Sequence, residues 1–78
     1  MELSANQISE LLQGTVEGNV ETSVSTLSKI EEGKPGSLSF LANPKYTEYI
    51  YDTQASIVIV GNDFTAEQAL KHNPTLIR

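Results

Sequence analysis

The run "ASIVIV", residues 55–60, decides the fold class of this chain. Its last four residues are all β-branched, and no polar residue interrupts them. A strand with one wet face alternates apolar and polar residues, whereas an unbroken apolar run is typical of a strand covered on both faces. We therefore predict an interior strand with helices packed on its sheet. The expected fold is a small single α/β domain with a mixed sheet flanked by short helices.

The segment before residue 15 has the signals of a helix. Ser4 can cap a helix start, and Gln7, three residues later, completes a capping box. Gly14 suits the left-handed conformation in which many helices end. We predict a helix over residues 5–13.

The period of the sequence changes to two after this helix. Val16 precedes a Gly18-Asn19 turn, and Val and Thr residues then alternate with polar ones over residues 20–26. This pattern predicts a β-hairpin with one wet face. A further strand is expected over residues 37–41.

The C-terminal half begins with a second predicted helix, over residues 44–52. Asn43 suits its N-cap, and Pro44 suits its first position, where a missing N–H costs nothing. A short helical period follows residue 61, and then a strand begins at Thr75. That strand would have about four residues where five or six are usual. We therefore expect the chain to be one domain of a longer protein.

Composition limits the partners of this chain. Ten acidic residues against five basic ones give a formal net charge of −5. Such a chain repels polyanions, so nucleic acid is not an expected partner. The longest apolar run is far shorter than the roughly 20 residues of a membrane span, and no basic and apolar leader opens the chain. Because cysteine is absent, disulfides are excluded, and we expect a soluble, cytoplasmic protein.

The sequence contains no recognisable reaction centre. His72 is the one histidine, and because no suitably spaced second ligand accompanies it, we interpret it as a surface residue. No serine lies in a G-x-S-x-G turn, and no glycine-rich phosphate loop is present. Glu31 and Glu32 are interpreted as part of a solvated turn. We expect no catalytic residue, no metal site and no cofactor in this chain.

The segment "FLANPKY", residues 40–46, needs a separate explanation, because an Asn-Pro helix start requires neither aromatic rings nor a lysine around it. Each residue has a purely structural interpretation. Phe40 shares a strand face with Leu38 and would pack in the core. Asn43 would only cap the helix, and Tyr46 would belong to a buried helical stripe. The residue pattern alone leaves packing and recognition both open.

A longer run, "SKIEEGKPGSLSFLANPKY" over residues 28–46, resembles the N-terminal domain of the UDP-3-O-acylglucosamine N-acyltransferases of bacterial lipid A biosynthesis. The opening helix with "GTVEGN", the run "ASIVIV" and the closing "LIR" are similar in type and order, so the resemblance covers nearly all of the chain. The N-terminal domains of the Mur ligases, which act on UDP-muramyl substrates, also resemble the "KPGSLSF" portion. They usually continue differently from "NPKY", which favours the acyltransferase family.

The resemblance implies that residues 1–78 form a uridine-binding domain, which in that family binds the nucleotide part of the UDP-sugar substrate. Phe40 and Tyr46 would hold the uracil between their rings. Asn43 would hydrogen-bond the edge of the base, and Lys45 is a candidate phosphate contact.

The resemblance also implies that catalysis lies outside this chain. In the family, a following left-handed parallel β-helix of hexapeptide repeats carries the catalytic histidine, forms a homotrimer and accepts acyl groups from acyl carrier protein. These 78 residues lack those repeats, so we expect the chain by itself to be inactive and monomeric. An alternative from the composition is a small acidic protein-interaction module without a nucleotide site.

Overall fold

The computed structural model describes residues 2–41, 44–61, 64 and 69–78. Its helices are α1 (Ala5–Leu12) and two 3-10 helices, η1 (Ile30–Glu32) and η2 (Pro44–Tyr51). Its strands are β1 (Leu3–Ser4), β2 (Val16–Glu17), β3 (Ser23–Val24), β4 (Thr26–Leu27), β5 (Ser37–Phe40), β6 (Ile57–Ile59) and β7 (Thr75–Ile77). Five strands form a mixed sheet in the order β2-β7-β6-β5-β4, and β1 pairs with β3. The predicted α/β fold is confirmed.

Strand β6 lies in the interior of the sheet, as its apolar run predicted. It pairs in parallel with β5 on one side and with β7 on the other. Ile57 and Val58 are both 0% exposed although they point to opposite faces. Each face therefore carries its own apolar cluster, and a polar residue in place of Ile57 or Val58 would lose packing.

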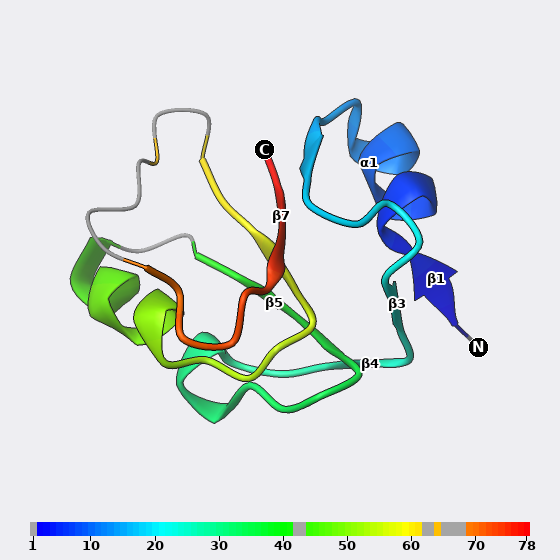
Figure 1. Ribbon diagram of the computed structural model, residues 1–78. Helices are drawn as coiled ribbons and strands as arrows, with labels where there is room; N and C mark the ends of the chain where they lie inside the picture. The colour runs from blue at the N-terminus through cyan, green and yellow to red at the C-terminus, as the bar shows by residue number, and fades with distance from the viewer. Residues whose placement is uncertain (1, 42–43, 62–63, 65–68) are drawn as a thin grey trace.

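The two faces of the sheet are covered by different helices (Figure 1). On one face, α1 packs its buried residues against a cluster of Ala5, Ile8, Val24, Ile57 and Ile77. On the other face, η1 and η2 each contribute a residue to a cluster of Ile30, Ile50, Ala55, Val58, Val60 and Leu76. Figure 1 shows α1 and η2 on opposite sides of β7. The expected helices on both faces are thus confirmed.

Helix α1 starts as predicted and ends differently. The Gln7 N–H donates to Ser4 Oγ over 3.2 Å, and the Ser4 N–H donates to Gln7 Oε1 over 2.9 Å, so the capping box is confirmed. The left-handed residue at the end is Gln13, with φ of 56°, and not Gly14 as predicted. Gly14 is needed for another reason: a Cβ there would lie 2.3 Å from the carbonyl oxygen of Arg78.

The predicted hairpin around residues 18 and 19 is wrong. Strand β2 pairs with the distant β7 in antiparallel register, with Val16 opposite Ile77. Strand β3 pairs with β1 instead. The reason is apolar burial: beside Ile77, Val16 packs against the α1-side cluster, whereas Val20 stays 47% exposed. Cross-strand packing with a buried partner outweighs the local turn signal.

The later elements follow the prediction more closely. The predicted helix over residues 44–52 is the 3-10 helix η2, and the predicted strand over residues 37–41 is β5, one residue shorter. The predicted strand at residue 75 is β7, which pairs on both sides. Most of the predicted third helical segment lies outside the described residues. In the described parts of the chain, no helix is long and apolar enough to cross a membrane.

Candidate functional site

Four strands of the sheet end at the same edge. Strands β4, β5, β6 and β7 run parallel to one another, so their carboxyl ends line up, and β2 runs the other way. Open α/β sheets usually bind ligands in the crevice outside these carboxyl ends. Phe40 is the last residue of β5, and η2 begins four residues later. Phe40 and the start of η2 therefore lie where a ligand is expected.

Phe40 is exposed at this edge. Its register partner is Ile59 of β6, and it points to the same face as Leu38, towards the side of the sheet that carries α1. Leu38 packs against the α1-side cluster, but Phe40 is 62% exposed. The cause is the position of α1, which contacts β2 and β7 and leaves the end of β5 uncovered. The core interpretation of Phe40 is thus wrong.

Tyr46 lies near the start of η2, and its ring packs beside that of a second tyrosine. Its ring centroid is 5.8 Å from that of Tyr49, and the ring planes are tilted by 37°. This separation lies within the favourable range for aromatic pairs. Both rings are more than a third exposed, whereas Ile50 on the same helix is 0% exposed. The interpretation of Tyr46 as part of a buried stripe is therefore wrong, and Ile50 alone of these three anchors η2.

The other two predicted site residues are placed less completely. Lys45 is exposed and precedes Tyr46 on η2. Asn43 lies outside the described residues, so its predicted cap and base contacts remain predictions. Of the predicted residues, Phe40, Lys45 and Tyr46 present exposed side chains on the β5 end and η2.

Buried serines hold the strand that carries Phe40. Ser37 and Ser39 of β5 are both 0% exposed. The Ser28 hydroxyl lies 2.9 Å from Ser37 Oγ and 3.0 Å from Ser39 Oγ, and Ser39 Oγ also donates to the Ser28 carbonyl over 3.0 Å. Each buried hydroxyl is satisfied, so these serines stabilise the β4–β5 junction and have no exposed nucleophile. His72 is exposed, as interpreted from the sequence.

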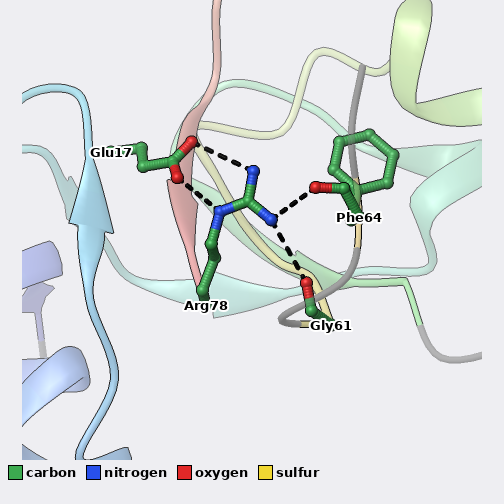
Figure 2. Close-up of polar contacts among 4 residues, drawn as sticks. All are labelled: Glu17, Gly61, Phe64 and Arg78. Carbon is green, nitrogen blue, oxygen red and sulfur yellow. Dashed lines mark hydrogen bonds and ion pairs between the residues drawn. The ribbon is translucent and has the colours of Figure 1, made fainter. Parts of the chain in front are cut away.

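Sequence reasoning missed an ion pair at the edge where the parallel strands end (Figure 2). The Arg78 guanidinium forms an ion pair with Glu17 through Nε, and its Nη2 donates to Glu17 Oε1 over 3.3 Å. These hydrogen bonds lower the pKa of the Glu17 carboxyl and raise the pKa of Arg78. Because the partners are 61 positions apart, their proximity could have been found only from the pairing of β2 with β7.

The comparisons with known proteins agree on one family. A model of the family described as UDP-3-O-(3-hydroxymyristoyl) glucosamine N-acyltransferase, LpxD, matches residues 21–78. Proteins named UDP-3-O-acylglucosamine N-acyltransferase from Phocaeicola vulgatus and Christiangramia forsetii are each 56% identical over 78 residues, 100% of this chain. A protein of the same name from Bacteroides thetaiotaomicron is 53% identical over the same span. The chain spans 22% of the length of each of these relatives.

Proposed function

This chain belongs to the family of UDP-3-O-acylglucosamine N-acyltransferases, and on that premise we propose that it is the domain that binds the uridine of their UDP-sugar substrate. The family match favours this interpretation over the Mur ligase alternative. The relatives' name contains a UDP-linked sugar, so a part that contacts the nucleotide is expected in such a protein. The aromatic side chains at the sheet edge make this chain a suitable candidate.

The observation that carries the proposal is the exposure of Phe40. Burying a phenylalanine side chain contributes about 1.5–3 kcal/mol, and a strand position beside Ile59 would normally secure that gain. The fold instead leaves the ring 62% exposed at the carboxyl end of β5. A flat nucleobase is a suitable cover, since stacking on an aromatic ring contributes about 1–3 kcal/mol per base.

The remaining residues supply the other parts of uridine recognition. Tyr46 offers a second exposed ring, and its contact with Tyr49 limits the motion of that ring before a ligand arrives. Asn43 carries one acceptor and two donors, which match the imide N–H and carbonyl groups of uracil. Lys45, beside Tyr46, is the proposed phosphate contact.

Acyl transfer is proposed to depend on the part of the relatives that these 78 residues do not match. The chain spans 22% of their length. On this proposal, acyl carrier protein and the trimer interface both engage the hexapeptide-repeat region of a longer polypeptide. The 78-residue chain then binds the nucleotide without turning it over.

The test is a titration of the chain with uridine, UDP and adenosine, followed by amide chemical shifts. We expect uridine and UDP to shift amides of residues 40–46, and adenosine at equal concentration to leave them in place. Changes that are equal for the purine, or that cluster elsewhere on the chain, would refute uridine recognition at this edge.

A further inference from the structure

Arg78 joins three segments at the carboxyl edge of the sheet (Figure 2). Its side chain starts from the end of β7 and reaches Glu17 on β2 in one direction. In the other direction its Nη1 donates to the backbone carbonyl of Phe64 and, over 3.4 Å, to that of Gly61. The guanidinium carbon also lies 6.0 Å from the centroid of the Phe64 ring. One side chain therefore connects Gly61 and Phe64 to the β7–β2 pair.

The first residue after β5 and the first residue after β6 each hydrogen-bond to the neighbouring strand. The Leu41 N–H donates to the Ile59 carbonyl over 2.8 Å, and the Val60 N–H donates to the Ile77 carbonyl over 2.8 Å. These bonds continue the three-strand ladder past Phe40 to Leu41 and Val60. Gly61 directly follows Val60, so it lies next to the hydrogen-bonded ladder that includes the strand end carrying Phe40.

Packing connects Phe64 to the tyrosine helix as well. Phe64 and Leu41 both pack against the apolar cluster on the η1 and η2 side of the sheet. That cluster contains Ile50, the fully buried residue of η2, four positions after Tyr46. Phe64, which Arg78 contacts, thus packs against the same apolar cluster as η2, the helix that carries Tyr46.

We propose that Arg78 is a positioning residue for the uridine site, which holds Gly61 and Phe64 so that Phe40 and Tyr46 are already in place when the base binds. This role rests on the proposed function. Arg78 acts through its backbone acceptors and not through its ion pair, since exposed ion pairs contribute little to stability. Its fork of N–H donors is suited to this task, because a single guanidinium can reach the carboxylate and two carbonyls in different directions.

The experiment compares uridine dissociation constants for the 78-residue chain and four variants, at a temperature where melting curves show each to be folded. Arg78→Met removes all contacts of the guanidinium. Arg78→Lys keeps the charge beside Glu17, but one ammonium cannot span that carboxylate and both carbonyls. Glu17→Gln removes the ion pair and leaves the carbonyl contacts. Val24→Ala is the matched control, because it weakens the buried cluster on the α1 side, away from η2.

We expect Arg78→Met to weaken uridine binding by about threefold to tenfold, the loss that follows when one or two side chains must be ordered on binding. Arg78→Lys should show a smaller loss, and it decides the question if the Met variant does not fold. Glu17→Gln and Val24→Ala should bind within about twofold of the unchanged chain. In the ligand-free protein, the Leu41 and Tyr46 amides should shift in Arg78→Met and stay in place in Glu17→Gln.

Two results would overturn the positioning role while leaving uridine binding intact. The first is an Arg78 variant that binds uridine as tightly as the unchanged chain. The second is a Val24→Ala protein that loses as much affinity as Arg78→Met, which would show a general loss of stability. If the unchanged chain does not bind uridine, the proposed function fails, and the positioning role fails with it.

Discussion

Replacing Phe40 by alanine separates a recognition role from a packing role. Truncating a fully buried phenylalanine costs about 3–5 kcal/mol of stability. Phe40 is 62% exposed, so well under half of its surface is buried. We therefore expect Phe40→Ala to lower the free energy of unfolding by only about 1–2 kcal/mol. In a chain of this length each kcal/mol corresponds to a decrease of about 4–8 °C in Tm.

The expected effect on binding is larger than the effect on stability. Loss of one stacking face removes about 1–3 kcal/mol of binding free energy, a Kd increase of about 5-fold to 150-fold. The assay combines a thermal melt followed by circular dichroism with a uridine titration at a temperature well below Tm. Uridine alone is expected to bind weakly, so the titration must extend to millimolar concentrations.

Leu38→Ala is the matched control for Phe40→Ala. Leu38 lies on the same strand and the same face, two residues earlier, but it packs against the α1-side cluster. We expect Leu38→Ala to cost about 2 kcal/mol of stability and to leave uridine affinity within about twofold. The reasoning is refuted if Phe40→Ala destabilises the chain as much as Leu38→Ala and binds uridine as well as the unchanged protein.

The remaining predictions concern other residues. Asn43→Asp should keep the stability of the chain, because Asp caps a helix as well as Asn. It should lose about 1–3 kcal/mol of uridine affinity, because a carboxylate has no N–H to donate. A thermal melt and a uridine titration of the variant check both outcomes. Because the pKa of Glu17 is lowered below 4.5, its ion pair with Arg78 stabilises the fold above the unfolded pKa, and this contribution should disappear as pH falls through the folded pKa. Denaturant unfolding of Glu17→Gln against pH should lack that loss. Gly14→Ala should destabilise the chain by about 1–3 kcal/mol in a melt, since its Cβ would lie 2.3 Å from the Arg78 carbonyl oxygen. Finally, the purified chain should sediment as a monomer and show no acyltransferase turnover; a stable trimer or measurable product would contradict the placement of both properties elsewhere.

Local patterns were sufficient to predict individual elements. The β-branched run of β6 predicts a strand covered on both faces, because an unbroken apolar run would expose apolar side chains on any wet face. The Ser4 and Gln7 capping box predicted the start of α1 because its two hydrogen bonds involve residues three positions apart. The rings and the lysine of residues 40–46 mark this segment as unusual, but a recognition role for Phe40 and Tyr46 comes only from the family resemblance, since the residue pattern by itself also allows core packing.

The tertiary structure decided which strands pair and which side chains are exposed. Val16 pairs with Ile77, and Glu17 forms an ion pair with Arg78. This pairing brings Val16 beside a buried partner, which a local hairpin at residues 18 and 19 would not do. Phe40 has the same strand pattern as Leu38, yet it is exposed, because α1 covers β7 and β2 and does not extend over the end of β5. A sequence determines which residues prefer burial, whereas what lies across from each residue depends on segments far away in the chain. For that reason the candidate site residues could be named from the sequence, but the exposure that makes Phe40 and Tyr46 available to a ligand could not.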